Sequence, residues 1–267
     1  MHVAVIGMGL IGGSFLKAAE RAGHTVTGHG RDLVPADLRN ADLILIAIPP
    51  SAVVPVITRI APHLKAGAVV VDATGVKERI CREMRTDAER RTWHFVGGHP
   101  MAGKEVSGWA NADADLFRGA SMILTPDPDT PAVILTGLAR FFREIGFSQI
   151  ITATPEHHDE MIAFTSQLAH VISSAFVRDP LARHHAGYSA GSFRDMIRVG
   201  APDPDMWTEL FLENRTALLP VIDRFIGRLA AFRDALAAAD APVLHAQLEE
   251  GREAKRELGN GGIGNVE

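Results

Sequence analysis

Short apolar runs alternate with helical patterns over the first 150 residues of the chain. Seven short segments predict β-strands, and several of them are continuous runs of Val, Ile and Leu, as is typical of strands buried on both faces of a parallel sheet. Helical patterns follow most of them, which predicts a doubly wound α/β sheet of the Rossmann type. The predicted strands are 2–7, 24–30, 42–49, 68–75, 94–98, 121–126 and 148–154, and the predicted helices lie around 12–22, 52–64, 77–91 and 131–145.

After Thr154 the pattern is helical, and no convincing strand follows. Thr154 is a suitable N-cap and Pro155 a suitable first residue for a helix. From Asp205 onward, apolar residues recur at spacings of three, four and once seven, which predicts a long helix. We expect Asp203 or Asp205 to cap this helix and Pro220 to kink it. Its apolar positions are Trp207, Phe211, Leu218, Ile222, Phe225, Leu229, Phe232 and Leu236.

These patterns predict three parts of the chain. We expect a dinucleotide-binding domain over residues 1–153, an all-α domain over 154–258 and a flexible tail over 259–267. The long apolar stripe of the helical domain favours self-association, because a small helical lobe alone would leave apolar surface exposed.

The composition is that of an ordinary globular protein, with 46% hydrophobic and 22% charged residues. The net charge of -5 gives no electrostatic footprint for nucleic acid. The single cysteine, Cys81, excludes an intrachain disulfide framework and a cysteine-based zinc cluster. The apolar N-terminal stretch is interrupted by glycines and indicates strand and loop rather than a signal peptide. With no apolar run of membrane-spanning length, we expect a cytoplasmic protein that does not bind membranes.

Residues 7–12 form a G-x-G-x-x-G between the first predicted strand and a predicted helix. The first glycine of such a loop permits a tight turn, the second lets the backbone approach a pyrophosphate, and the third lets the helix pack on the sheet. The strand before it and the helix after it favour a dinucleotide site over a merely structural turn. We expect the cofactor to contact Gly7, Gly9, Leu10, Ile11 and Gly12.

The end of the second predicted strand bears on the choice between NAD and NADP. NAD sites usually carry an acidic residue there that binds the ribose hydroxyls, and Gly30 occupies that position. Arg31 follows and suits a 2′-phosphate, which favours NADP slightly, whereas Asp32 keeps NAD open. The short connection to the third strand predicts a missing crossover helix and a trimmed adenine pocket.

Four unusual loops leave the carboxyl ends of predicted strands, where open parallel sheets bind ligands. We expect them to meet around the nicotinamide, with Pro49 and Thr74 in contact with the cofactor. His99 lies in one of these loops and precedes Pro100, which biases its backbone to extended conformations. It is either a hydrogen-bonded loop histidine or, as we favour, a general base, because histidine titrates near neutrality. The loops are 7–12, 49–50, 72–77 and 99–108.

Several motifs together resemble the prephenate/arogenate dehydrogenases of tyrosine biosynthesis. They are GMGLIGGS, GGHPMAGKEVSG, TPEHHDEMIAFTSQLAHVISSA, and SAGSFRDMIRVG with the later DMWTELFLENR, and the resemblance runs from residue 1 to about 235. It implies an N-terminal Rossmann domain, an all-α domain through which such enzymes dimerise, and NAD(P) as cofactor. It also implies an oxidative decarboxylation, in which a hydride leaves C4 of a cyclohexadienol for the nicotinamide, carbon dioxide is lost and the ring becomes aromatic.

The resemblance implies roles for individual residues. His99 would accept the hydrogen bond or proton from the C4 hydroxyl, so activity should fall as His99 becomes protonated below about pH 6.5. Arg198 matches a substrate-binding arginine that grips a carboxylate, although it could be a helix-surface arginine. Glu105 matches a position near the pocket mouth or lies in a solvated loop, and Gly191 shapes the pocket or serves a backbone turn.

Two positions depart from the family pattern. Many members have serine at the position of Gly75, where it helps the catalytic histidine; Thr74 or a water could substitute here. Many also have histidine at the position of Gln167, which can hydrogen-bond substrate but cannot titrate. His170 lies on roughly the same helix face as Gln167 and is either a pocket residue or a packed helix histidine.

Other functions are less well supported by the sequence. The β-hydroxyacid dehydrogenase and ketopantoate reductase group uses a lysine in or near the helical domain, and this chain has none between Lys104 and Lys255. A non-catalytic nucleotide sensor would have no need of the His99 loop and Arg198 together. We expect no metal, because neither histidine pair, 157–158 or 184–185, has a supporting Cys or carboxylate array. Prephenate is favoured modestly over arogenate, and no residue discriminates the two.

Overall fold

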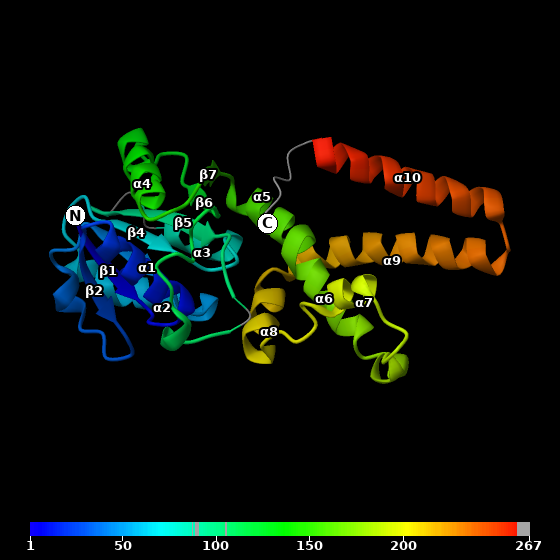
Figure 1. Ribbon diagram of the computed structural model, residues 1–267. Coiled ribbons are helices and arrows are strands. Elements are labelled where there is room, and N and C mark those ends of the chain that lie inside the picture. The colour runs from blue at the N-terminus through cyan, green and yellow to red at the C-terminus, as the bar shows by residue number, and fades with distance from the viewer. Residues whose placement is uncertain (87, 89–90, 105, 261–267) are drawn as a thin grey trace. The chain divides into compact units, whose positions relative to one another are not determined.

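The computed structural model describes residues 1–86, 88, 91–104 and 106–260 (Figure 1). The chain forms two compact units, residues 1–218 and 219–267, which are described separately. Glu105 and residues 261–267 of the expected flexible tail lie outside the described residues.

All seven predicted strands are present, and they form one sheet in the order β2-β1-β3-β4-β5-β6-β7. Strand β1 lies between β2 and β3, so the chain runs from β1 to β2 on one side and then returns to β3 on the other side of β1, as expected for a Rossmann-type fold. The strands are β1 (His2–Ile6), β2 (Thr25–His29), β3 (Leu43–Ile46), β4 (Val69–Asp72), β5 (His94–Pro100), β6 (Ser121–Pro126) and β7 (Gln149–Thr152).

The sheet is mostly parallel, but β6 runs antiparallel to β5, and β7 is parallel to β6. A parallel neighbour needs a crossover connection, usually a helix, whereas an antiparallel neighbour does not. Among the described residues between β5 and β6, the regular structure is the short 3₁₀ helix η4 (Trp109–Asn111). The reversal therefore follows from a connection without a crossover helix, which the apolar pattern of the strands did not reveal.

Helices cover both faces of the sheet, which confirms the doubly wound arrangement (Figure 1). One core lies under α2 and α3, and the other lies under α1 and α4, where Phe15 stacks on Phe117 with ring centroids 4.4 Å apart. A single 3₁₀ turn, η1 (Pro35–Leu38), stands between β2 and β3, so the missing crossover helix is also confirmed. The helices are α1 (Leu10–Arg21), α2 (Pro50–Ile60), α3 (Glu78–Arg85) and α4 (Ala132–Glu144).

The chain after β7 is helical, as predicted. Thr154 caps α5 by accepting a hydrogen bond from the His157 backbone N–H, and Asp203 caps α8 through the Met206 N–H. A π-helical turn joins α5 to α6, and such turns are frequent at functional sites. The elements of this part are α5 (Pro155–Ile162), the π turn η5 (Ala163–Gln167), α6 (Leu168–Phe176), η6 (Pro180–His184), α7 (Gly191–Ile197) and α8 (Pro204–Glu213).

The long helix expected from Asp205 onward is two helices, because the chain breaks at Asn214 and not at Pro220. Asn214 ends α8 and turns its side chain to the Asp159 carbonyl and to Gln167. Pro220 lies inside the following helix α9 (Arg215–Ala237), and α10 (Ala241–Asn260) includes the first two residues of the expected tail. None of the helices described here has the length and apolar character needed to cross a membrane.

Candidate active site

The glycine loop after β1 has the geometry that close approach of backbone requires. Gly7 has φ +97°, and a Cβ built on it would lie 2.2 Å from the Ala47 carbonyl oxygen. A Cβ on Gly12 would lie 1.7 Å from the Gly7 carbonyl oxygen, so both positions need glycine. A Cβ on Gly9 would meet nothing within 4 Å. Gly9 is the N-cap of α1 and makes no side-chain cap, so the first turn around Leu10 and Ile11 fits a dinucleotide phosphate.

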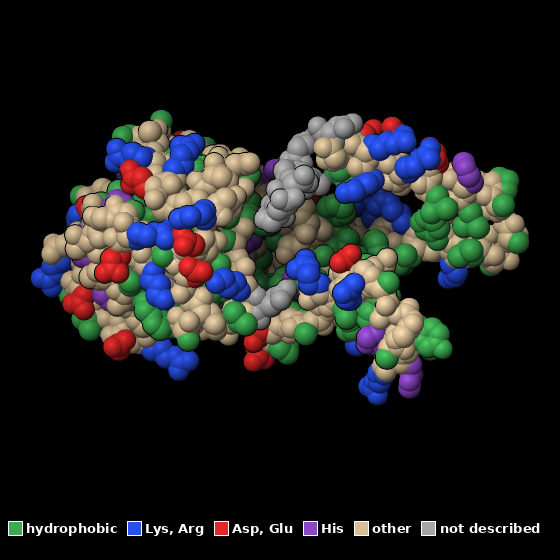
Figure 2. Space-filling view, viewed as in Figure 1, with side chains coloured by type: hydrophobic (Ala, Val, Ile, Leu, Met, Phe, Trp, Pro, Cys, Tyr) green, Lys and Arg blue, Asp and Glu red, His purple; other side chains and the backbone are tan. Residues whose placement is uncertain are grey.

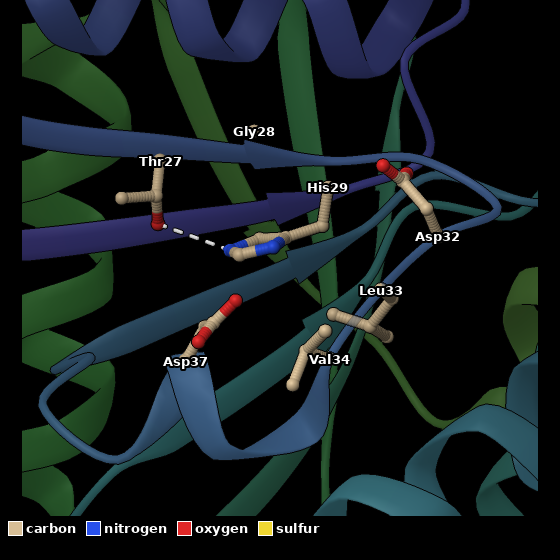
Figure 3. Close-up of a pocket in the computed structure, with 7 residues that line it drawn as sticks. All are labelled: Thr27, Gly28, His29, Asp32, Leu33, Val34 and Asp37. Atoms are coloured by element: carbon tan, nitrogen blue, oxygen red, sulfur yellow. Dashed lines mark hydrogen bonds between the residues drawn. The ribbon is translucent and has the colours of Figure 1, made fainter.

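A pocket lies at the carboxyl end of β2, where the adenosine of a dinucleotide is expected (Figure 3). Asp32 turns back toward the strand, so that a Cβ on Gly30 would lie 3.2 Å from Asp32 Oδ1. Asp37 reaches toward the His29 imidazole from η1 (Figure 3). Burial lowers the pKa of His29, although Asp37 opposes this shift. Arg31 is exposed, and the pocket is lined by Thr27, Gly28, His29, Asp32, Leu33, Val34 and Asp37.

His99 is the penultimate residue of β5, which extends two residues beyond the predicted strand. Its backbone pairs with Ile123 of β6, so strand pairing holds it in place. The side chain is half-buried, and its Nδ1 lies 2.9 Å from Nε2 of His158 on α5. The expected general base is therefore fixed by a strand and a neighbouring helix rather than carried on a free loop.

His158 and Asp159 connect His99 to a buried carboxylate. His158 Nδ1 lies 2.7 Å from Asp159 Oδ1. The same carboxylate accepts hydrogen bonds from the backbone N–H groups of Lys77 at 2.8 Å and Glu78 at 2.9 Å. The side chains of His158 and Asp159 are both buried. Each oxygen of the Asp159 carboxylate accepts a hydrogen bond from the protein, as a buried carboxylate requires.

A buried ion pair lies beside these residues. The Lys77 ammonium donates to the Asp72 carboxylate and, at 2.9 Å, to Thr74 Oγ1. Thr74 donates in turn to Asp72 Oδ2 at 2.6 Å. Asp72 also accepts from the Gly98 N–H, one residue before His99. The hydroxyl of Thr74 is thus hydrogen-bonded to the ion pair, whereas its neighbour Gly75 lies beside the His99 ring.

Burial sets the protonation of both histidines. It lowers the pKa of His99 well below 6.5, and the charge on Lys77 lowers it further. Burial also lowers the pKa of His158, although the hydrogen bond that His158 makes to the Asp159 carboxylate raises it. Both imidazoles are therefore neutral at neutral pH, which is the state that a hydrogen-bond acceptor for a hydroxyl requires.

Gly75 leaves space at the other side of the His99 ring. A Cβ on Gly75 would lie 3.8 Å from His99 Nε2 and 3.4 Å from Leu210 Cδ2 of α8, both ordinary contacts. His99 Nε2 therefore points to the side on which the family often has a serine hydroxyl. The position could take a small side chain without displacing the protein.

Gln167 is buried and hydrogen-bonded within the protein. Its Oε1 accepts from Asn214 Nδ2 at 2.7 Å, and its Nε2 donates to the Leu210 carbonyl at 3.2 Å. These bonds hold the end of α8, whose Leu210 packs beside Gly75. Both polar groups of the Gln167 side chain therefore bond to the end of α8 and its cap.

The remaining predicted residues lie along α6, α7 and the sheet edge. His170 Nδ1 lies 3.2 Å from the Val199 carbonyl oxygen, which can only accept, so Nδ1–H is the donor. The His170 ring lies against Trp207, with ring centroids 3.6 Å apart and the planes tilted by 34°. The charge of Arg198 contributes to the lowered pKa of His170, after burial, which places the two near each other. Gly191 begins α7 and is exposed, and Pro49 is the exposed N-cap of α2.

Four residues of this network were not predicted from the sequence: Asp72, Lys77, His158 and Asp159. His158 was considered only as part of a metal-binding pair, and Asp72 and Lys77 only as the ends of a loop. The sequence signal that could have found them is the H-D pair in the first turns of a helix following the last strand, together with the D-A-T-G-V-K loop. In the part of the chain that the structure describes, no three His, Cys, Asp or Glu side chains are grouped to hold a metal ion.

Comparison with known proteins finds two family models that match successive parts of the chain. The model for the prephenate dehydrogenase nucleotide-binding domain matches residues 16–151, and that for the prephenate dehydrogenase dimerization domain matches residues 154–250. The chain is 35% identical to a cyclohexadienyl dehydrogenase of Zymomonas mobilis, over 96% of each protein.

Solved structures of this family have the same fold. Synechocystis arogenate dehydrogenase matches with a TM-score of 0.82 and 26% identity, covering 97% of this chain and all of that one. Prephenate dehydrogenase from A. aeolicus, solved with hydroxyphenyl propionate and NAD+, matches with a TM-score of 0.83 and 26% identity, covering 97% of this chain and 98% of that one. The glycine loop, the strand-held histidine and these matches agree, and the chain belongs to the prephenate dehydrogenase family.

Proposed function

We propose that the protein catalyses the NAD(P)-dependent oxidative decarboxylation of prephenate to 4-hydroxyphenylpyruvate. When bound, the nicotinamide accepts the hydride from C4 of the substrate. His99 is the observation that carries the proposal, because its neutral imidazole is held at the carboxyl edge of the sheet with Nε2 turned away from His158. In that state Nε2 accepts the hydrogen bond from the C4 hydroxyl, which favours hydride departure and loss of carbon dioxide.

Arginine and histidine side chains of the helical part are proposed to bind the substrate. Arg198 would grip a carboxylate, with His170 beside it. Glu105 remains proposed near the pocket mouth, and Gly191 is proposed to shape the pocket or to serve a backbone turn. Gln167 is proposed to support the site through α8. Gly7, Gly9, Leu10, Ile11, Gly12, Pro49 and Thr74 are proposed to line the cofactor site.

The test is an assay at 340 nm with prephenate and arogenate, each with NAD+ and NADP+. Arogenate is the second candidate substrate, because Synechocystis arogenate dehydrogenase matches this chain closely in fold. His99→Asn should lower kcat about 10²- to 10⁴-fold and leave the KM for substrate little changed. The control is His157→Asn, since His157 is exposed on α5 next to the network and should retain full activity. Turnover of neither substrate, or an active His99→Asn enzyme, would refute the proposal.

The pocket at the end of β2 supports NAD+ over NADP+, although Arg31 at first favoured NADP+. Asp32 places a carboxylate where a side chain at position 30 would lie, so it can replace the missing acid that binds the ribose hydroxyls. Asp37 adds a second carboxylate, and the lowered pKa of His29 leaves that ring neutral near pH 7. The pocket therefore repels a 2′-phosphate, while the Arg31 side chain is exposed beside it.

Calorimetry with the two oxidised cofactors separates the roles of Asp32 and Arg31. The unmodified protein should bind NAD+ more tightly than NADP+. Asp32→Ala should tighten NADP+ binding about 5- to 10-fold, which corresponds to roughly 1 kcal/mol for one unscreened charge pair in water, and should weaken NAD+ binding. Arg31→Ala should leave NAD+ binding unchanged. Tighter binding of NADP+ by the unmodified protein, lost in Arg31→Ala, would establish the opposite preference.

We also propose that residues 1–153 form a nucleotide-binding domain and residues 154–258 a helical domain. The chain is proposed to form a homodimer through this helical domain. The matching family model describes a dimerization domain. Within the unit of residues 219–267, large apolar side chains are exposed, and Figure 2 shows them gathered where α9 turns into α10. Light scattering of the purified protein tests the dimer, and a monomer at micromolar concentration would contradict it. The exposed residues include Leu229, Leu236, Val243 and Leu248.

The cytoplasmic location of the protein stays a prediction.

A further inference from the structure

The two nitrogens of the His99 ring have different surroundings. Nδ1 lies 2.9 Å from His158 Nε2, and on the other side a Cβ at Gly75 would lie 3.8 Å from His99 Nε2. A neutral imidazole carries its proton on one nitrogen only, so the choice of tautomer decides whether Nε2 can accept a hydrogen bond.

The direction of the hydrogen bonds follows from Asp159. An ionised carboxylate can only accept, so the bond of 2.7 Å requires the proton on His158 Nδ1. Neutral His158 then has a lone pair on Nε2, which must accept from His99 Nδ1–H. The proton of His99 is thereby fixed on Nδ1, and the lone pair is left on Nε2.

The surrounding charges maintain the neutral state that this direction requires. The groups that face the two rings are Asp159 on α5 and the Lys77–Asp72 pair of the loop between β4 and α3. Asp159 and Asp72 raise the pKa of His158, whereas burial and the Lys77 ammonium lower it, and the lowering prevails. For His99 burial, His158 and Lys77 all act to lower the pKa. A proton shared between the rings is therefore disfavoured from both sides.

We propose that His158 and Asp159 are positioning residues that hold His99 in the tautomer with a free Nε2 lone pair. The catalytic consequence rests on the proposed function, in which Nε2 meets the C4 hydroxyl of the substrate. In this chain the His158–Asp159 pair replaces the serine that many family members have at position 75, because the pair orients the His99 base from the opposite side of its ring. Charge that develops on His99 as it accepts the hydroxyl proton is stabilised by the Asp159 carboxylate through His158.

A merely structural role for this pair is the competing explanation, since Asp159 also anchors α5 to the backbone of Lys77 and Glu78. The variants His158→Gln and His158→Met separate the positioning role from the structural role, because glutamine and methionine side chains have nearly the same shape. Glutamine places an amide oxygen near the position of Nε2 and can accept from His99 Nδ1–H, whereas methionine offers only a weak acceptor.

The first measurement is of the ring nitrogens of His99 in the ¹⁵N-labelled, ligand-free protein by NMR. We expect a protonated Nδ1 and an unprotonated Nε2 in the unmodified protein and in His158→Gln. In His158→Met the two tautomers of His99 should mix. An unmodified protein that carries the His99 proton on Nε2 would overturn the proposal by itself, even if neither variant folds and whatever substrate the enzyme uses.

The second measurement is steady-state kinetics with the cofactor saturating. His158→Met should lower kcat about 10- to 100-fold, below the full loss expected for a general base, with substrate KM within about threefold. His158→Gln should retain kcat within about fivefold, because its amide oxygen still accepts from His99 Nδ1–H and only the hydrogen bond to Asp159 is lost, which contributes roughly 1 kcal/mol. Equal kcat values for the two variants, with equal thermal stability, would show that the acceptor at position 158 does not matter. A protein that turns over neither substrate would refute the proposed function, and the NMR result would still decide the tautomer.

Discussion

The two ends of the proposed cofactor site differ in how their charged groups are satisfied. Near His99, the charges of Asp72, Lys77 and Asp159 are buried and hydrogen-bonded to the protein. At the end of β2, the Asp32 and Asp37 carboxylates are exposed around a pocket. Buried charges are costly to leave without a partner, whereas exposed ones are screened by water. The buried end can therefore fix one geometry for chemistry, and the exposed end can select a ligand by charge without contributing much to stability.

The largest effect is expected from breaking the buried ion pair. Lys77→Met should lower the free energy of unfolding by about 3–5 kcal/mol, because it leaves the Asp72 carboxylate buried without its cation. The matched control is Lys65→Met, which removes the exposed Lys65–Asp42 pair and should cost at most about 1 kcal/mol. Urea unfolding of both variants measures the difference. Equal losses would mean that burial does not determine how much stability is lost when an ion pair is broken.

The protonation of the buried histidines gives the next prediction. Since the pKa of His99 lies well below 6.5, kcat/KM should stay near its plateau at pH 5.5, where a histidine of ordinary pKa would be only about one-tenth neutral. This replaces the loss of activity below pH 6.5 that the sequence suggested. A pH profile of kcat/KM with a midpoint at 6.5 would show that burial does not control His99.

Stability should decrease over the pH range in which activity stays near its plateau. Unfolding lets His99 and His158 take up protons near pH 6.5, whereas the folded protein holds both neutral. The unfolded state therefore binds more protons below 6.5, and the free energy of unfolding should decrease as pH falls, by up to about 1.4 kcal/mol per unit for each histidine. Urea titrations between pH 7.5 and 5.5 measure this slope, and a flat profile would contradict the lowered pKa values.

A smaller effect is expected at the exposed end. Asp37→Asn removes one carboxylate from the β2 pocket and should tighten NADP+ binding about two- to threefold, since exposed charge pairs contribute roughly 0.2–1 kcal/mol. NAD+ binding and the midpoint of thermal unfolding should not change. Asp129→Asn makes the same change of charge at another exposed position and should leave both affinities as they are. A loss of stability in Asp37→Asn would show that the Asp37 carboxylate contributes to the fold, as the buried charges near His99 do.

The sequence revealed the residues whose role depends on local context. The seven strands and the glycine loop each follow from a run of neighbouring residues and are present near the expected positions, whereas His99, expected in a loop, lies at the end of β5. His158 is 59 positions from His99, and only the packing of α5 against the end of β5 brings the two rings together. The turn that carries Asp32 back to Gly30 is equally invisible in the order of residues, in which Arg31 favours NADP slightly and Asp32 keeps NAD open. The break at Asn214 has the same origin, since its partners come from α5 and η5.

Gly75 is the place where the buried end of the site has room, and it offers the smallest and sharpest test. A Cβ there makes ordinary contacts with Leu210 and the His99 ring, so Gly75→Ala and Gly75→Ser should change the free energy of unfolding by less than about 1 kcal/mol. The serine hydroxyl would lie near His99 Nε2 and the C4 hydroxyl of the substrate. It should raise kcat above that of the alanine variant by at most about tenfold, the value of one hydrogen bond. Because His158 and Asp159 already fix the tautomer of His99, the serine can only add to a base that is in place. A gain far beyond tenfold, measured in the same 340 nm assay, would mean that His99 is poorly oriented without it and that the buried network stabilises the fold rather than the chemistry.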